Sequence, residues 1–477
     1  MKNSLTPSYN QLYINGKWKT PYRSKKIEVI NPATEKMIGS VPEGSQEDVE
    51  EAIKSARAAF DSWSTTSSSV RSAYINKLVE EMKTHKDQMA EVITSELGMP
   101  LHFSLDIQSV GPIVGLESHI DITRQLEEEK HIDNSVVYNE AIGVCSLICP
   151  WNYPLHQLIG KIAPALAAGC TMVVKPASET PLNAFLLAQM IDNIDLPAGV
   201  FNLITGPGRT IGEAMCVHPE VDLVSFTGST QAGIQIAKVA ADSVKRVCQE
   251  LGGKSPFIIT EDADIEAAVT FGVQDVMLNS GQTCTALTRM LVPYSRYEEV
   301  LQHAKQVAEN ITIGDPLNKE SFMGPMSSKK QQDIVFNYIK KGLEEGATLL
   351  SGGLDKPQGL EKGYYIRPTI FSDVKNEMVI AQEEIFGPVL CIIPYQTIDE
   401  AIVLANDSPF GLSAAVWGNT KEQALKVAKK IKSGQVFING GDYNYRAPFG
   451  GFKQSGNGRE WGLAGAMEYV EQKSIQF

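Results

Sequence analysis

The sequence predicts an α/β protein built on parallel sheets, and three observations support this expectation. Short apolar segments that resemble strands alternate with amphipathic segments that resemble helices, which is the pattern of βαβ units. The strand segments are apolar along their whole length, as expected where helices cover both faces of a sheet. The chain of 477 residues is also long enough for about three domains.

The first part of the chain is predicted to be helical. Residues 45–63 place their apolar side chains on one helix face, and Ser45 with Asp48 resembles a capping box at the start. A second helical pattern runs from 70 to 97 and ends at Gly98.

Alternating strands and helices begin near residue 142 and form two series. The strands of the first series are predicted at 143–149, 171–175, 200–204 and 222–226, and its helices at 156–168, 181–192, 209–217 and 230–242. The strands of the second series are predicted at 289–293, 389–394, 413–417 and 435–438, and its helices at 263–279, 295–310, 327–346, 398–406 and 420–432. The glycine-rich segment 252–256 separates the series and predicts a domain boundary.

Two further segments belong to neither series. Residues 120–141 contain three consecutive glutamates followed by apolar residues, which predicts a hairpin on an exposed arm rather than a core strand. The C-terminal residues 469–477 resemble a strand that has no obvious sheet of its own.

Composition and charge exclude several classes of partner. The formal net charge of −13 argues against nucleic acid or an anionic membrane as the main partner. The most apolar stretch, 162–174, is shorter than the roughly 20 residues of a membrane span, and the N-terminus lacks the apolar core of a secretory signal. The seven cysteines are scattered and show no zinc-like pairing, so we expect no metal site and a reducing, cytoplasmic compartment.

Two glycine-rich turns between a predicted strand and a predicted helix are candidate phosphate sites. Residues 205–212 approach the pattern G-x-G-x-x-G with one extra residue, and residues 226–233 offer free N–H groups and small hydroxyls. Both turns, like Lys175, lie at the carboxyl ends of predicted parallel strands, where open sheets bind ligands. The alternative is structural, since glycine is common in such turns and Lys175 could be a solvated loop residue.

Cys284 differs from the other cysteines because residues 279–286 around it are small and polar, which leaves room for a substrate to reach a nucleophilic thiolate. A half-buried structural thiol is the alternative. Glu250 stands at the break between the two series and could act as a base on water, or could be a surface glutamate before a turn. Asn152 lies between two prolines and could donate to an oxyanion, or could belong to a structural turn.

Six segments together closely resemble motifs of the aldehyde dehydrogenase superfamily, and the resemblance covers nearly the whole chain. They are PWNYP at 150–154, FTGSTxxG at 226–233, ELGGKSP at 250–256, GQTCTAxxR at 281–289, EEIFGPV at 383–389 and PFGGFKxSG at 448–456. The resemblance implies a Rossmann-like dinucleotide-binding domain, an α/β catalytic domain and a small β arm for oligomerisation into a homodimer or homotetramer. These parts would comprise 1–122 with 143–252, then 253–457, and finally 123–142 with 458–477, respectively.

The resemblance also implies oxidation of an aldehyde to a carboxylic acid, with NAD or NADP as cofactor. Cys284 would attack the carbonyl carbon, Asn152 and the backbone N–H of Cys284 would hold the oxyanion, and Glu250 would activate the water that hydrolyses the thioester. Lys161 would support the site by hydrogen bonding or proton relay. The implied cofactor contacts are Trp151, Lys175, Ser178, Gly208, Gly228, Ser229, Thr230, Gly233, Glu384 and Phe386.

One position departs from the family pattern. NAD-preferring members commonly carry glutamate three residues after the strand-end lysine, whereas this chain has Ser178 there and the acid displaced to Glu179. Serine would not repel a 2′-phosphate, so we expect NADP to be tolerated as well as NAD. The presence of Glu250 favours a free acid over an acyl-CoA product.

The substrate and two other classes of function stay open. The residues expected near the aldehyde tunnel are Tyr153, His156, Gln157, Thr283, Thr285 and the loop 442–446, where Arg446 either meets a substrate carboxylate or is solvated. A cofactor-independent cysteine hydrolase or acyltransferase would need a histidine near Cys284, reached through space because none lies between 218 and 303. A non-catalytic dinucleotide-binding relative would be expected to lack Cys284 or Glu250, and both are present.

Overall fold

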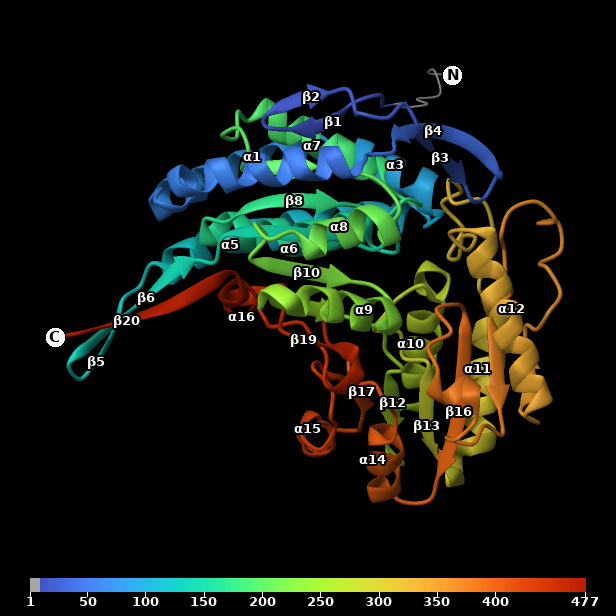
Figure 1. Ribbon diagram of the computed structural model, residues 1–477. Coiled ribbons are helices and arrows are strands. Elements are labelled where there is room, and N and C mark those ends of the chain that lie inside the picture. The colour runs from blue at the N-terminus through green and yellow to red at the C-terminus, as the bar shows by residue number, and fades with distance from the viewer. Residues whose placement is uncertain (1–8) are drawn as a thin grey trace.

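The structure is a computed structural model that describes residues 9–477, and these form two main sheets and a projecting arm (Figure 1). The first sheet has five parallel strands at its centre, in the spatial order β9-β8-β7-β10-β11. Their bounds are β7 (Val144–Ile148), β8 (Thr171–Lys175), β9 (Phe201–Leu203), β10 (Leu223–Thr227) and β11 (Arg246–Glu250). Antiparallel strands extend both edges, namely β1 (Leu12–Ile14) with β2 (Lys17–Lys19) beside β9, and β19 (Gly456–Asn457) beside β11.

The order of these strands defines where a ligand can bind. The chain adds β8 and then β9 on one side of β7, and β10 and then β11 on the other, so the strand order reverses between β7 and β10. Ligands bind open α/β sheets outside the carboxyl ends of the strands at such a reversal. Ile148 and Thr227 end the two strands at this point.

Helices cover both faces of the first sheet. One face packs against α1 (Gln46–Ser64), with α8 (Glu213–Val217) and α9 (Thr230–Ala240) on the same side, and the other packs against α6 (Pro154–Ala168) and α7 (Leu182–Asn193). Alternate residues of β7 and β8 face the two helix layers. Val144 and Val173 belong to the apolar cluster of α1, α8 and α9, whereas Cys145 and Met172 belong to the cluster of α6 and α7. The uniformly apolar strands of the sequence are explained by this double burial.

The helices before β7 confirm the predicted start and change the predicted course. Ser45 caps α1 in a capping box with Asp48. The single helix predicted over 70–97 is wrong, because α2 (Ser68–Thr84) and α3 (Lys86–Leu97) are separated at His85. There the Thr84 hydroxyl donates to Glu80 O and the His85 ring nitrogen Nδ1 forms a hydrogen bond with Glu81 O. These side chains satisfy carbonyl groups in the last turn of α2, where the helix ends.

A long helix follows that the sequence analysis did not predict. It is α5 (Gly111–Leu126), preceded by α4 (Leu101–Phe103) and η1 (Ser104–Val110), and α5 packs on α2 and α6. Residues 120–126 are therefore helical, and the predicted exposed hairpin is shorter than 120–141. It consists of β5 (Lys130–Ile132) and β6 (Ser135–Ala141).

The second sheet has the order β14-β15-β16-β13-β12-β17-β18, and all neighbours are parallel except β14 and β15. Its strands are β12 (Pro256–Ile259), β13 (Arg289–Pro293), β14 (Thr348–Ser351), β15 (Thr369–Ser372), β16 (Val389–Tyr395), β17 (Ala415–Trp417) and β18 (Phe437–Ile438). Two helices cover one face, α10 (Ile265–Met277) and α11 (Tyr297–Glu309). The other face carries α12 (Lys329–Glu344), α13 (Val379–Gln382), α14 (Ile398–Asn406) and α15 (Lys421–Ala428).

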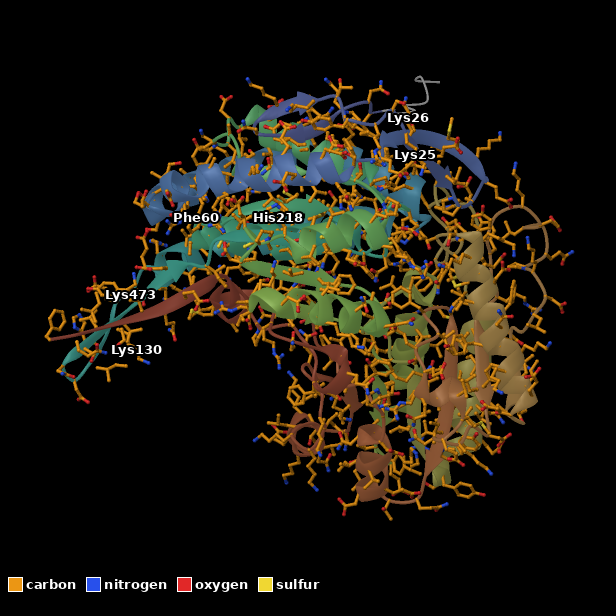
Figure 2. The ribbon with its side chains drawn as sticks, viewed as in Figure 1. Lys25, Lys26, Phe60, Lys130, His218 and Lys473 are labelled. Atoms are coloured by element: carbon orange, nitrogen blue, oxygen red, sulfur yellow. The ribbon has the colours of Figure 1, made fainter. Side chains whose placement is uncertain are left out.

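The C-terminal strand finds its sheet in the arm. β20 (Val470–Gln476) pairs antiparallel with β6 from Val470 opposite Ala141 to Gln476 opposite Ser135, which gives a three-stranded sheet with the order β20-β6-β5. This arm extends away from both sheets in Figure 1, and Figure 2 places Lys130 and Lys473 on it. The short helix α16 (Gly462–Ala466) packs on α5 and α6 before the arm begins.

The remaining elements are short. A hairpin of β3 (Lys26–Asn31) and β4 (Lys36–Pro42) forms a separate sheet. Single turns of other helix types are η2 (Gly208–Gly212), η3 (Ala241–Ser243), η4 (Leu278–Gly281), η5 (Tyr294–Arg296), η6 (Lys453–Ser455) and η7 (Met467–Tyr469). Among the helices of residues 9–477, none combines the length and the hydropathy needed to cross a membrane.

The predicted boundary near 252–256 coincides with the passage between the sheets. β11 ends the parallel part of the first sheet at Glu250, and β12 starts the second at Pro256. The division of the chain into a dinucleotide-binding and a catalytic domain stays a prediction, and residues 456–457, placed by that prediction with the second part, pair with β11 of the first sheet.

Candidate active site

Cys284 lies where two cavities meet. The first cavity measures about 250 Å³ and the second about 510 Å³, and the side chain of Cys284 lines both. Of the seven cysteines it is the one that is half-buried, while the other six are buried. A group at this position can contact two different molecules at once.

The first cavity lies between the facing edges of the two sheets. Residues that follow the carboxyl ends of β7 and β10 form one wall, and residues that precede the amino ends of β13 and β16 form the other. The predicted site residues that line it are Trp151, Asn152, Gly228, Ser229, Cys284, Glu384 and Phe386. The strand reversal between β7 and β10 therefore opens directly onto the candidate nucleophile.

The loop that carries Cys284 has an unusual backbone. Asn279, Ser280 and Gly281 are all left-handed, with φ of 51°, 56° and 73°, and two of them are not glycine. Such a conformation is held only when its surroundings fix it. Here Asn279 Nδ2 donates to Asn152 O at 3.0 Å and Ser280 Oγ donates to Gly324 O at 2.8 Å.

Gln282 completes the support of this loop. Its Nε2 donates to Asn279 O at 2.9 Å, and its Oε1 accepts from Ser327 N at 2.8 Å. A side chain at Gly281 would collide with Gly387 O, so the turn requires glycine. The sequence indicated only a small, polar segment, whereas the structure shows a rigid one.

Asn152 is held beside this loop. Its side chain is buried, and Nδ2 donates to Gln282 O at 3.0 Å. Its own carbonyl accepts from Gln108 Nε2 and Asn279 Nδ2, each at 3.0 Å. A fixed amide donor at the edge of the first cavity is the type of group that stabilises an oxyanion.

The thiol of Cys284 is protonated at rest. Burial raises its pKa, and the carboxylates of Glu384, Glu250 and Glu460 raise it further. A neutral thiol is a weak nucleophile, so a base has to accept its proton when it attacks.

Glu250 is buried at the carboxyl end of β11, and this contradicts its alternative interpretation as a surface glutamate. Neither carboxylate oxygen has a hydrogen-bond partner among residues 9–477. Burial and the charge of Glu460 raise the pKa of Glu250 well above its ordinary value, while Lys161 opposes this shift. A carboxyl group with a raised pKa and free oxygens is suited to general base catalysis.

Lys161 lies in α6 and connects to residues that the sequence analysis did not single out. Its Nζ donates to Thr227 Oγ1 at 2.7 Å and forms an ion pair with Glu460. Burial lowers the pKa of Lys161, but the charges of Glu460, Cys149 and Glu250 and the hydrogen bond to Glu460 together outweigh it, so the net shift is upward. Thr227 is inside a recognised motif, but no local pattern in the sequence marks Glu460.

The other predicted cofactor contacts lie outside the first cavity. Lys175 ends β8 and is buried; its Nζ donates to Pro176 O at 3.0 Å, and burial lowers its pKa. Ser178 is half-buried and Glu179 is exposed. The remaining three predicted contacts lie in helices that follow strands of the same sheet. Gly208 starts η2, and Thr230 and Gly233 lie in α9.

These residues fit a dinucleotide. The first-turn N–H groups of Thr230 and Gln231 have no intrahelical acceptor, as at the start of any helix, and they suit a phosphate. Trp151 and Phe386 pack edge to face with ring centroids 5.3 Å apart, and both rings line the first cavity as apolar surfaces. Glu384 Oε1 accepts from Gly253 N at 3.0 Å, and burial raises the Glu384 pKa to about 7. A side chain at Gly252 would collide with Glu384 Oε2 and displace this carboxylate.

The second cavity is lined by most of the residues expected near a substrate tunnel. They are Tyr153, His156, Gln157, Thr283, Thr285, Asp442, Tyr443 and Tyr445. Tyr153 Oη and Thr283 Oγ1 share a hydrogen bond of 2.8 Å. Arg446 does not line this cavity. Its side chain is 70% exposed, and its Nη2 lies 3.7 Å from Asp121 Oδ2. In residues 9–477 no group of three or more His, Cys, Asp or Glu side chains could hold a metal ion.

Comparisons with known proteins agree with this geometry. Residues 18–475 match the model of the aldehyde dehydrogenase family. The chain is 47% identical over 468 residues to a 3-succinoylsemialdehyde-pyridine dehydrogenase from a Pseudomonas species, which covers 98% of each chain.

Solved structures of aldehyde dehydrogenases are also similar to this chain over nearly their whole length. A mutant of aldehyde dehydrogenase C from Pseudomonas syringae in complex with NAD+ and octanal is 45% identical, with a TM-score of 0.95 over 98% of this chain and 96% of that one. An aldehyde dehydrogenase from Mycobacterium tuberculosis in complex with NAD+ is 40% identical, with a TM-score of 0.96 over 98% of each chain. The predicted α/β fold and the resemblance are confirmed, and this chain belongs to the aldehyde dehydrogenase family.

Proposed function

We propose that the protein oxidises an aldehyde to the carboxylic acid with NAD or NADP, using Cys284 as the nucleophile. The position of Cys284 at the junction of the two cavities carries this proposal. A thiol there can bond an aldehyde in the second cavity while a dinucleotide occupies the first.

The first half of the reaction forms a covalent adduct on the protein. Cys284 Sγ bonds the carbonyl carbon while its proton passes to a base, for which Glu250 is the candidate. The amide Nδ2 of Asn152 and the backbone N–H of Cys284 hold the negative charge that develops on the carbonyl oxygen. When bound, the nicotinamide supplies an acceptor for the hydride, and a thioester on Cys284 remains.

The second half releases the acid. Glu250 first gives up to solvent the proton it accepted from Cys284 and then removes a proton from water. The water oxygen attacks the thioester carbon, the bond to Sγ breaks, and the thiolate of Cys284 takes back a proton. Lys161, held by Thr227 and Glu460, stabilises the charged form of Glu250. Because this base is present and buried beside the site, the proposed product is a free acid rather than an acyl-CoA.

The relatives support the cofactor and leave its preference open. Solved aldehyde dehydrogenases similar to this chain were determined with NAD+. Ser178 places no carboxylate three residues after Lys175, and Glu179 is exposed, so we propose that NADP is accepted too.

A cysteine hydrolase is the less favoured alternative. His156 shares the second cavity with Cys284, but it packs with Tyr445 and Trp461 at centroid distances of 5.7 and 5.0 Å. Within the described part of the chain no hydrogen bond joins His156 to Cys284. Burial lowers the His156 pKa to about 4, so it is a weak base.

The arm supports a homodimer or homotetramer. β20 and β5 are the edges of a three-stranded sheet, and each pairs with β6 alone among residues 9–477. Exposed apolar side chains, Ile132 and Ile475, accompany these edges. An exposed, partly apolar edge is a surface for association. The seven free thiols support a cytoplasmic, reducing location.

The deciding experiment measures reduced cofactor by absorbance with a panel of aldehydes and either NAD or NADP. We expect activity with the native protein and none with Cys284→Ala. Glu250→Gln removes the candidate base of both half-reactions, so it should slow the release of the first equivalent of reduced cofactor and lower steady-state turnover by about 10²-fold or more. If no aldehyde gives cofactor reduction that depends on Cys284, the proposal is wrong.

A further inference from the structure

We propose that the second cavity selects aldehydes without negative charge and rejects aldehydes that carry a carboxylate. This inference rests on the proposed function, because the cavity is taken as the path of the aldehyde to Cys284.

The charged groups that line the second cavity are all acidic. They are Asp106, Asp275 and Asp442, and no lysine or arginine accompanies them among the described residues. Asp106 and Asp442 are exposed, whereas Asp275 is half-buried and its Oδ2 accepts from Leu287 N at 2.9 Å. Burial raises the Asp275 pKa to about 6, so Asp275 is ionised in an assay at pH 8.

The inner end of the cavity adds no positive charge. Glu384 and Glu250 are close enough to Cys284 for their charges to raise the pKa of its thiol. Lys161 is the nearby cation, but it is fully buried, paired with Glu460 and absent from the lining of either cavity. A substrate carboxylate would therefore lose water and meet like charge without a cation to pair with.

The neutral part of the lining is largely aromatic, and its hydroxyl and amide groups carry no charge that could pair with a carboxylate. Tyr443 and Tyr445 pack edge to face with ring centroids 4.8 Å apart, and Phe449 continues this aromatic wall. His156 joins the cluster and is uncharged at neutral pH, since its pKa lies near 4. Walls of this kind favour an apolar or aromatic body, and the volume of about 510 Å³ is ample for one.

Arg446 is the second cation to consider, because it belongs to the loop 442–446 at the mouth of the cavity. Its side chain is 70% exposed and its guanidinium lies 3.7 Å from Asp121. It lines neither cavity, so a carboxylate at the tail of a substrate has no counter-ion within the described tunnel.

The test compares two aldehydes of nearly equal shape, 4-formylbenzamide and 4-formylbenzoate, at pH 8 and low salt. We expect kcat/KM to be higher for the amide by at least about tenfold. Asp275→Asn should narrow this ratio severalfold because it removes a negative charge from the lining. Asp399→Asn, at a position 83% exposed that lines neither cavity, is the matched control and should leave the ratio unchanged.

Two failures can be told apart. If 4-formylbenzoate is oxidised as well as the amide or better, with activity lost in Cys284→Ala, the inference is wrong and the proposed function stands. If neither these nor other aldehydes give Cys284-dependent cofactor reduction, the proposed function itself is wrong. A ratio that Asp275→Asn and Asp399→Asn change equally would also overturn the assignment to the lining carboxylates.

Discussion

Lys161 and Glu460 form an ion pair in the protein interior although 299 residues separate them in the chain. The Lys161 side chain is 0% exposed and that of Glu460 is 6% exposed. The two charges act in opposite directions on Glu250, because Glu460 raises its pKa and Lys161 lowers it. Burial is the main cause that raises the pKa of Glu250, and the pair adjusts the pH at which this candidate base becomes ionised.

Glu460→Gln should extend activity to lower pH. The substitution removes the negative charge that raises the Glu250 pKa and leaves the positive charge that lowers it, so Glu250 loses its proton at a lower pH. The acid limb of the kcat profile should move down by about one pH unit or more. The measurement is kcat against pH at saturating aldehyde and cofactor.

Glu460→Asp serves as the control for that shift, since it keeps the charge and should keep the acid limb near its original position. An acid limb that stays in place or moves up in Glu460→Gln would show that Glu460 does not control Glu250. Thermal unfolding of each variant reports the separate cost of disturbing the buried ion pair.

Alkylation of the free enzyme by iodoacetamide should label Cys284 first and should accelerate with pH. The other six thiols are buried, so they are protected until the protein unfolds. Burial and nearby carboxylates raise the Cys284 pKa, so the thiolate fraction should increase about tenfold per pH unit between pH 7 and 9. Mass spectrometry of the peptide that contains Cys284 follows the rate.

A labelling rate that levels off below pH 8 would contradict this prediction, because it would indicate a thiol with an ordinary or lowered pKa. Cys284→Ala should show no fast labelling in the same assay.

Local sequence signals predicted the parts of this molecule that local forces determine. The capping box at Ser45 and the apolar strands β7, β8 and β10 were predicted because each depends on neighbouring residues. β11 was not predicted, since Arg246, Gln249 and Glu250 interrupt its apolar character. It is a strand because β10 and β19 pair with it.

The residues of the candidate site also fall into two groups, those that local sequence indicates and those that only the fold brings together. The small, polar neighbours of Cys284 mark it in the sequence, but the residues that fix its loop, Gly324 and Ser327 among them, are distant in sequence. Glu460 has no local signal at all, because its importance comes from contact with Lys161 across the fold. The place of Glu250 at the break between the two series makes it a candidate base and the family resemblance implies that role, but its burial depends on distant segments such as β19, which pairs with β11.

Ser178→Glu should shift cofactor preference towards NAD. A carboxylate at this position would repel the 2′-phosphate of NADP and could accept hydrogen bonds from the ribose hydroxyls of NAD. We expect the ratio of kcat/KM for NADP to that for NAD to fall by about tenfold or more. Ser178→Gln, which has nearly the same size without the charge, should change the ratio much less. Equal effects of the two variants would assign the change to size rather than charge.

Gly253→Ala should inactivate the enzyme through the backbone of Cys284. A Cβ on Gly253 would collide with the carbonyl oxygen of Cys284, and because this is a backbone atom it cannot move aside as a side chain would. Hydrogen bonds fix the chain before the nucleophile at Gln282 O and after it at Leu287 N, so the collision should displace Sγ relative to Asn152. A displacement of about 1 Å lowers catalysis by about 10²-fold.

Gly418→Ala is the matched control for this substitution. A Cβ on Gly418 would meet the Cβ of Ala424 at 3.4 Å, an ordinary contact, and Gly418 lines neither cavity. We expect it to retain kcat and the melting temperature, whereas Gly253→Ala should lose kcat and about 1–3 kcal/mol of stability from overpacking. Full activity in Gly253→Ala would contradict this prediction. It would show that the loop can move away from Gly253 without any loss of catalysis.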